Sequence, residues 1–276
     1  MLDEWLKYNG SEENNYLFTL IHVTEDRSPD QSVIAYISEE VLKAYRNLGY
    51  LKFSYQREPK ERLVDYLNSY VLPSEKNQIT KNVGQGDFGE ILASLIVTFF
   101  QNLLVPIHKL QWKYNKDRTL FCTDMIAHNQ GEKIKDIYYY EIKTRSIIKK
   151  EKPKKDAESN YITVIAHNGL LKDELTPNEG IADFLSRYFY EKGDYDNSKK
   201  YFDIVKNPQK YNRNYELFFI IEKSKFITDI LDDLNNLPPI LSPLNVTVVL
   251  IDELQRLVVE TRQKVIDEAI NYVYEK

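Results

Sequence analysis

The sequence predicts an α/β fold in which a buried helix is followed by three strands, a helical region and a further strand. Three observations predict this order. No charged residue occurs from Ile91 to Ile107, which is typical of a helix buried on all sides. Three segments with many β-branched and aromatic residues follow. Residues 160–205 then read as helical pieces separated by Pro177, Gly180 and Gly193.

Residues 1–80 are predicted to form a separate N-terminal α+β unit. Residues 16–23 and 32–37 read as strands because β-branched and aromatic residues dominate them. Ser38 is a candidate helix cap, with Glu39 and Glu40 in the first turn, where carboxylates are favourable. Apolar residues at helical spacing predict a helix over 61–71, ended by Pro73. The polar segment 73–87, with Gly84 and Gly86, is the predicted domain boundary.

The strongest predicted helix extends from Phe88 to Val105. Its apolar residues form one stripe, and the opposite face is small or apolar, so both faces should be buried. Asp87 is a candidate N-cap. Glu90, in the first turn, is the last charge before the buried run.

The remaining elements follow from the same patterns. The polar segment 128–135, which contains Gly131, reads as a hairpin loop. Strands are predicted at 109–114, 119–127, 136–144, 215–223 and 245–251, and an amphipathic closing helix at 252–274.

Composition excludes several classes of protein. The 276 residues include 37 Lys and Arg against 42 Asp and Glu, giving a net charge of −5; this charge excludes a protein that coats nucleic acid through its overall field. The single cysteine, Cys122, excludes a disulfide scaffold or a Cys-rich zinc site. The apolar run is shorter than the roughly 20 residues that span a bilayer. The N-terminus lacks a signal-peptide pattern, and no Walker-type glycine loop is present. We therefore expect a cytoplasmic protein that contacts no membrane and has no P-loop ATP site.

The chemistry centres on two predicted neighbouring strands. Glu141 and Lys143 are two residues apart, so they share one face of their strand. The 128–135 hairpin can pair that strand with the preceding one and place Asp124 beside Glu141. Two carboxylates and one ammonium would then lie in a mostly apolar sheet.

Such a group of charges is costly to bury, and one lysine cannot neutralise two carboxylates. A divalent cation can, and Mg²⁺ prefers carboxylate oxygens, water and substrate phosphate. The carbonyl of Ile142 offers a further oxygen. Lys143 would lie beside the metal, where it could orient or deprotonate a water and offset charge on a phosphate. The arrangement suits phosphodiester hydrolysis with Mg²⁺ or Mn²⁺.

These residues resemble a known nuclease pattern. Asp124, sixteen further residues and then Glu141-Ile142-Lys143, with Glu90 on an upstream helix, resemble the PD-(D/E)xK nuclease core. Residues 84–146 resemble more specifically the HamA family, the nuclease subunit of the bacterial Hachiman anti-phage system. Two features depart from the superfamily: Thr123 replaces the usual proline, and no Gln-x-x-x-Tyr helix signature follows Lys143.

The resemblance implies a fold, a site and a partner. The fold is a restriction-endonuclease-like core over 81–276, behind the N-terminal unit. Asp124 and Glu141 would be metal ligands, Lys143 the catalytic lysine and Glu90 an accessory ligand. The implied partner is a HamB-like, ATP-driven helicase that restrains the nuclease until foreign or damaged DNA is engaged. Residues 1–80 are rich in Tyr and Leu and contain no catalytic set of residues, so we expect them to form the docking surface for that partner.

A basic run follows the predicted catalytic strand. From Glu141 to Lys155, seven basic residues face two acidic ones, a net charge of +5. Such a run could hold a DNA backbone without sequence choice, although a solvated loop is the commoner role. The candidate DNA-binding residues are Arg145, Lys149, Lys150, Lys152, Lys154 and Lys155.

Each site residue also has a structural interpretation. Glu141 and Lys143 could be an exposed edge-strand pair, Asp124 a structural partner of Lys143, and Glu90 a residue that favours its helix N-terminus. The main alternative function is a non-catalytic DNA-binding or regulatory subunit with a degenerate nuclease fold. A sequence-specific restriction enzyme is a third possibility, which would require base-reading loops. Convergence of the four side chains in space would argue against the structural interpretations together.

Overall fold

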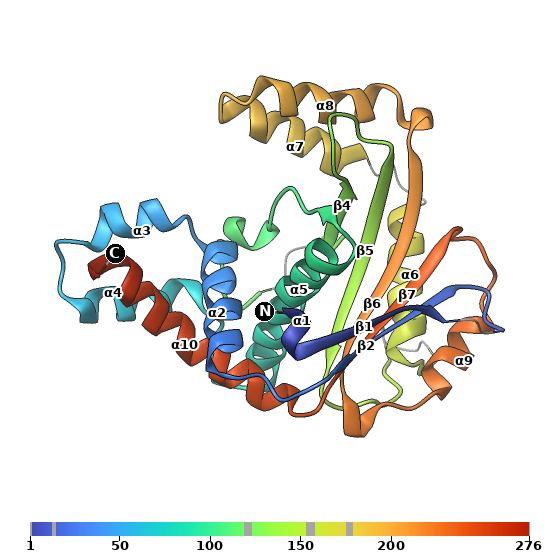
Figure 1. Cartoon of the computed structure of the whole chain (residues 1–276), viewed down its shortest axis with the longest axis horizontal. Helices are drawn as coiled ribbons and strands as arrows, with labels where there is room; N and C mark the ends of the chain where they lie inside the picture. Colours follow the sequence, from blue (N-terminus) through green and yellow to red (C-terminus); the bar gives the residue numbers. More distant parts are fainter. Residues whose placement is uncertain (1, 13–14, 119–122, 153–157, 175–178, 276) are drawn as a thin grey trace.

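The computed structural model describes residues 2–12, 15–118, 123–152, 158–174 and 179–275. A seven-stranded sheet with the order β1-β2-β7-β6-β5-β4-β3 forms its centre (Figure 1). The fold is therefore mixed α/β, as predicted. The strands are β1 (Leu6–Glu12), β2 (Thr19–Glu25), β3 (Leu103–Leu104), β4 (Met125–Asn129), β5 (Asp136–Arg145), β6 (Asn212–Glu222) and β7 (Leu244–Ile251).

Helices cover both faces of this sheet (Figure 1). The α-helices are α1 (Leu2–Trp5), α2 (Gln31–Tyr45), α3 (Leu48–Tyr55), α4 (Lys60–Tyr66), α5 (Gln78–Phe100), α6 (Ile162–Glu174), α7 (Glu179–Glu191), α8 (Tyr195–Lys206), α9 (Asp229–Asn235) and α10 (Leu254–Tyr274). The shorter helical turns are η1 (Leu67–Val71), η2 (Lys109–Trp112), η3 (Pro208–Lys210) and η4 (Lys223–Lys225).

The four central strands run parallel, and antiparallel strands flank them. β2, β7, β6 and β5 pair in parallel, whereas β1 with β2, β4 with β5 and β3 with β4 are antiparallel. Alternate side chains enter two apolar cores. Ile220 and Val249 face α2, α5 and α10, while Phe219 and Val248 face α6 and α9. All four of these side chains are fully buried, as expected of parallel strands covered on both faces.

The predicted N-terminal unit contributes two strands to this common sheet. β2 confirms the strand predicted at 16–23, shifted toward the C-terminus, and it pairs with β7 near the end of the chain. β1 was not predicted. The division near residue 80 therefore does not separate two sheets, and the predicted boundary segment 73–87 includes the first ten residues of α5.

The strand predicted at 32–37 is wrong, because this segment lies in α2. The Asp30 side chain caps the helix by accepting from the backbone N–H groups of Ser32 and Val33. Buried side chains then recur at helical spacing. Ser38 is likewise not a cap, because its hydroxyl donates to the carbonyl of Ile34, 2.7 Å away, inside the helix. Helix capping and burial override the strand propensity of these residues.

The long apolar helix is confirmed, but it begins and ends earlier than predicted. α5 starts with a capping box between Asn77 and Thr80, so the predicted N-cap role of Asp87 is wrong. The helix ends at Phe100, two residues before Asn102, whose positive φ of 54° stops further helical bonding. By length and composition, α5 is the one described helix apolar enough to cross a membrane, and 61% of its apolar window is buried inside the fold.

A glycine lets α5 approach the sheet closely. A Cβ atom at Gly89 would overlap the hydroxyl of Thr144 on β5. Only glycine permits this separation. Because Glu90 is the next residue, the close approach brings a carboxylate from α5 to the edge of the sheet.

The segment between α5 and β4 differs from the prediction. The strand predicted at 109–114 is wrong, because residues 109–112 form the 3₁₀ turn η2. Among the described residues of the strand predicted at 119–127, β4 starts at Met125, and Thr123 and Asp124 precede it. Cys122 and residues 119–121 lie outside the described residues.

Most later elements are confirmed. β5, β6, β7 and α10 match their predicted segments, and α6, α7 and α8 form the expected helical region. The hairpin loop between β4 and β5 contains Gly131 with a φ of 121°, a conformation that favours glycine. α9 was not predicted.

Glu216 on β6 should make folding stability depend on pH. It is fully buried beside Asn245, whose amide donates to one carboxylate oxygen at 2.5 Å. Burial raises the pKa of Glu216 to about 7, so the folded protein keeps its proton more strongly than the unfolded chain. The free energy of unfolding should therefore fall as pH rises from about 4.5 to 7.

Replacing this carboxyl with an amide (E216Q) should remove that loss. We expect the variant to match the unmodified protein at pH 5 and to exceed its unfolding free energy by roughly 2–3 kcal/mol at pH 8. Urea unfolding across this pH range measures the difference. An equal difference between the two proteins at both pH values would contradict a buried, protonated Glu216.

Candidate active site

The end of β4 places Asp124 directly beside β5. Met125 pairs with Tyr140 in the antiparallel register, so Asp124 lies opposite Glu141. The backbone N–H of Asp124 donates to the carbonyl of Tyr140 at 3.2 Å. Its carboxylate oxygen Oδ2 accepts from the backbone N–H of Ile142 at 2.9 Å. The side-chain carboxylate of Asp124 thus accepts the hydrogen bond that a backbone carbonyl would accept if β4 continued beside β5.

The ammonium of Lys143 gathers three oxygen atoms. Its Nζ lies 2.5 Å from Oε1 of Glu141, 3.3 Å from Oδ2 of Asp124 and 3.2 Å from the carbonyl oxygen of Ile142. These are the oxygens of three predicted metal ligands. The predicted convergence of Asp124, Glu141 and Lys143 is therefore present in the structure.

Glu90 joins the group through a lysine that the sequence did not single out. Lys109, in η2, places its Nζ 2.9 Å from Oδ1 of Asp124 and 3.5 Å from Oε1 of Glu90. We call Glu90, Lys109, Asp124, Glu141 and Lys143 the carboxylate–lysine cluster. Its side chains are 14–21% exposed, so each is largely withdrawn from water but reachable.

A second buried ion pair lies behind Glu90. Lys113 donates to both carboxylate oxygens of Asp87, at 2.7 and 2.5 Å, and the hydroxyl of Tyr45 donates to Asp87 at 2.5 Å. Burial raises the pKa of Asp87, against the lowering effect of Lys113. The pair ties the segment after η2 to α5.

The sequence contained a signal for these missed residues. Asp87 and Glu90 are three apart on one helix, and Lys109 and Lys113 are four apart in the next segment. The first spacing puts both carboxylates on one face of an α-helix, and the second puts both lysines on one face of a strand. Spacing alone does not show that these two lysines meet the two carboxylates of α5, because that contact depends on how the chain turns back after the helix.

Burial and mutual repulsion perturb two of the carboxyl groups. Burial raises the pKa of Glu90 to about 8, with a further increase from the charge of Asp124 and an opposing effect of Lys109. Burial also raises the pKa of Glu141 to about 7; the charge of Asp124 adds to this, and Lys143 opposes it. Both groups therefore change protonation near neutral pH.

Asp124 and Lys143 are shifted in the directions that keep both charged. Burial acts to raise the pKa of Asp124, but Lys143, Lys109 and the N–H of Ile142 hold it below its usual value. Burial acts to lower the pKa of Lys143, but Asp124 and Glu141 raise it. Asp124 is thus the anchoring anion of the cluster, and Lys143 is a stable cation.

The donor set of the cluster fits a hard divalent cation in chemistry and charge. All its donors are carboxylate or carbonyl oxygens, as Mg²⁺ prefers, and three carboxylates face two ammonium groups. In the described part of the chain, no three acidic, His or Cys side chains are already close enough together to hold a metal. Instead, the lysine ammonium groups lie between the oxygens. A cation would therefore have to displace them from these contacts.

Helix α6 closes the site beside Glu141. A Cβ atom at Gly169 would lie 3.3 Å from Oε1 of Glu141, tighter than most real contacts. The absence of a side chain at Gly169 leaves room for the carboxylate.

The basic run lies directly after the cluster, but its members differ. Arg145 pairs with Glu151 at 3.0 Å, and Lys150 lies over the ring of Tyr161 at 5.1 Å. Lys149 and Lys152 are exposed. Lys154 and Lys155 lie outside the described residues.

Together, the fold and the cluster define a mixed α/β protein with a largely buried carboxylate–lysine site at the end of an antiparallel strand. No curated protein matches the chain. The family model named HamA matches residues 2–265 of the 276, and the chain belongs to that family. The match includes every residue of the cluster and most of the N-terminal segment. Membership assigns the chain to Hachiman antiviral defence.

Proposed function

We propose that this protein is a metal-dependent DNA nuclease, the effector subunit of a bacterial anti-phage complex that acts with a HamB-like helicase in the cytoplasm. One observation carries the proposal: oxygens of Asp124, Glu141 and Ile142 converge within 3.3 Å of the Lys143 ammonium. The order α5, β3, β4, β5, α6 to α8 and β6 also supports a PD-(D/E)xK core of helix, three strands, helix and strand.

The chain's own groups have distinct roles in this proposal. Asp124, Glu141 and the carbonyl of Ile142 would hold Mg²⁺ or Mn²⁺, with Glu90 as an accessory ligand. When bound, such an ion supplies a water of lowered pKa and neutralises charge on a phosphate. The raised pKa of Lys143 favours an electrostatic role, in which its ammonium stabilises charge that develops on the scissile phosphate. Arg145, Lys149, Lys150, Lys152, Lys154 and Lys155 would contact the DNA backbone.

Metal binding gives a test that is independent of cleavage. We expect Mn²⁺ to stabilise the protein by about 2.7 kcal/mol at a concentration about 100 times the Kd, because the ion binds only the folded state. Glu141→Ala should abolish this stabilisation. Glu151→Ala, which removes a carboxylate paired with Arg145 outside the cluster, should retain it. Thermal unfolding of the unmodified protein and of the two variants across a Mn²⁺ titration measures the stabilisation.

The cleavage assay separates the nuclease from the alternative function. Purified protein, with and without the helicase encoded beside it, is incubated with Mn²⁺ on linear, nicked and supercoiled DNA and on RNA. The proposal expects DNA cleavage that a chelator removes. DNA binding without cleavage and without Mn²⁺ stabilisation would favour the non-catalytic subunit with a degenerate nuclease fold.

The helicase partner is proposed to dock on α3 and the turn that follows α4. Phe53 on α3 is 81% exposed, Tyr50 is 52% exposed and Tyr70 is 67% exposed. Exposed aromatic side chains of this kind often anchor protein interfaces. Deleting residues 1–75 would also remove β1, β2 and α2, so point variants provide a cleaner test.

Replacing both Phe53 and Tyr70 with serine should weaken helicase binding by roughly 10-fold or more, because two aromatic anchors are lost. Tyr195→Ser, at a position 56% exposed on α8, is the matched control and should leave binding unchanged. Binding is measured by surface plasmon resonance with the purified helicase. Unchanged affinity in the double variant would place the interface elsewhere.

A further inference from the structure

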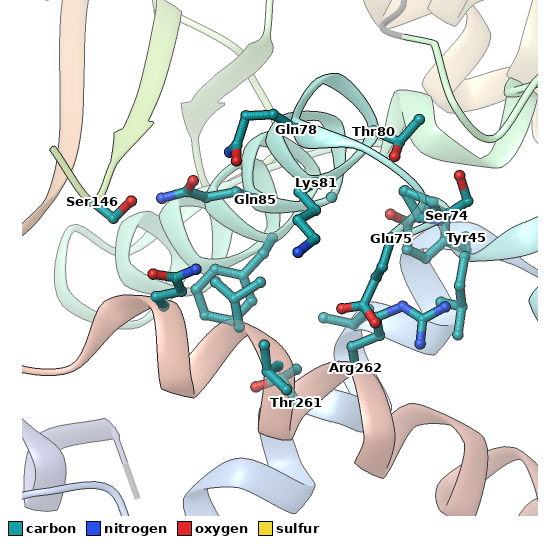
Figure 2. A pocket seen from close by; sticks show the side chains of 18 residues that line it. Tyr45, Ser74, Glu75, Gln78, Thr80, Lys81, Gln85, Ser146, Thr261 and Arg262 are labelled. Atoms are coloured by element: carbon teal, nitrogen blue, oxygen red, sulfur yellow. The ribbon is translucent and has the colours of Figure 1, made fainter.

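A pocket of about 130 Å³ lies between α2, α5 and α10, away from the carboxylate–lysine cluster (Figure 2). From α5 it is lined by Lys81, Gln85 and Phe88, whereas Glu90 faces the other side of that helix, where it contacts Lys109. Its apolar wall consists of Val41, Leu72, Pro73, Phe88, Val258 and Val259. The proposed nuclease chemistry does not use this pocket.

The polar lining of the pocket is mainly cationic. Figure 2 shows the side chains of Lys81 and Arg262 reaching into the space between α5 and α10. In the described part of the chain, no ion pair joins Lys81 to another residue. An open groove next to the pocket shares Glu75 and Arg262 with it and adds Lys76 and Lys116. The pocket and the groove together are thus lined by four cationic side chains and by one carboxylate, that of Glu75.

Three polar atoms of the pocket lining lack a hydrogen-bond partner. Among the described residues these atoms are Nε2 of Gln85, Nε of Arg262 and Oγ1 of Thr261, each shielded from solvent. Thr261 is 1% exposed. Buried polar groups in folded proteins are nearly always paired, and the two nitrogens can act only as donors. These two donor nitrogens therefore have no acceptor oxygen in the described structure.

We propose that this pocket binds a nucleoside monophosphate. Phosphate oxygens would accept from Gln85 and Arg262, and the charge of the phosphate would meet Arg262 and Lys81. The apolar wall with Phe88 suits a base, and the open groove that shares Glu75 and Arg262 with the pocket leaves room for the rest of the nucleotide. The binding mode uses side chains and needs no glycine-rich loop.

The proposal is tested by calorimetric titration of the full chain with AMP, GMP, CMP and TMP. Adenosine, which lacks the phosphate, and inorganic phosphate, which lacks the nucleoside, are titrated for comparison. At least one monophosphate should bind saturably, and adenosine and phosphate should each bind more weakly. Lys81→Gln should weaken that binding by roughly 10-fold or more, since it removes a charged contact. Lys264→Gln, on α10 but outside the pocket lining, is the charge-matched control and should bind normally.

A second variant tests the cavity without changing charge. A Cβ atom at Gly84 would lie 3.6 Å from the side chain of Pro73, an ordinary contact. The longer side chain of Gly84→Met would fill the pocket while favouring the helix, so nucleotide binding should disappear and the melting temperature should not fall.

Several results would overturn the proposal. One is the absence of monophosphate binding at millimolar concentration. Another is that Gly84→Met binds the nucleotide as tightly as the unmodified protein. The third is binding of a 5′-phosphorylated oligonucleotide but of no monophosphate, which would show that the pocket binds nucleic acid instead. None of these results depends on the carboxylate–lysine cluster, so they leave the nuclease proposal to its own tests.

Discussion

Replacing Lys143 with alanine should reduce Mn²⁺-dependent DNA cleavage by roughly 10²–10⁴-fold, the range found when a group acting on the transition state is removed. Its ammonium contacts the oxygens of Asp124, Glu141 and Ile142. Its contact with Glu141 is the shortest of the three, at 2.5 Å, so the variant removes the cation nearest to the proposed metal ligands. The rate is measured on linear DNA at saturating metal.

The control for this variant separates loss of chemistry from loss of DNA binding. Lys149→Ala removes an exposed lysine six residues further along the chain and should change cleavage by only a small factor. Lys143→Ala should also keep its melting temperature within a few degrees, because Lys109 still pairs with Asp124. Full activity in Lys143→Ala would show that the proposed mechanism is wrong.

The largest effect on stability is expected from breaking the buried pair between Asp87 and Lys113. These side chains are 4% and 3% exposed, so Asp87→Ala should lower the free energy of unfolding by roughly 3–5 kcal/mol, since it leaves an uncompensated buried charge. Replacing Asp87 with leucine and Lys113 with methionine together should recover much of the loss, because no charge then remains. Urea denaturation measures both.

An exposed ion pair provides the comparison. Asp183 and Arg187 on α7 are 3.0 Å apart, with side chains 46% and 66% exposed. Asp183→Ala should cost about 0.5 kcal/mol or less, because solvent screens such pairs. Similar losses for Asp87→Ala and Asp183→Ala would mean that the Asp87–Lys113 pair is not buried in solution.

Local patterns predicted the part of the site that depends on strand geometry. Alternation along β5 placed Glu141 and Lys143 on one face, and the hairpin loop brought Asp124 opposite Glu141. These relations follow from the two-residue period of a strand and from pairing across a short loop. The same local logic predicted the strands β6 and β7, whose buried stretches 215–221 and 246–251 are apolar except for Glu216 and Thr247.

Relations that depend on tertiary packing could not be read from local patterns. Lys109 and Lys113 contact α5 only because the chain turns back after that helix. In the sequence, the alternating polar and apolar residues of segment 109–114 resemble an ordinary amphipathic strand. Residues 32–37 have a strand-like composition, but Asp30 caps a helix there, and burial against the sheet decides the outcome. The pocket near Lys81 is formed by three helices that are distant in sequence, and no single segment reveals it.

The place of Asp124 just before β4 has a consequence for how such a chain can change. Its carboxylate bonds to the backbone of β5, so the position of the acid is fixed by the alignment of the two strands. A slip of one residue in that alignment would send Asp124 to the opposite side of the sheet. The turn between these strands can therefore tolerate substitutions more readily than changes in length that shift the pairing.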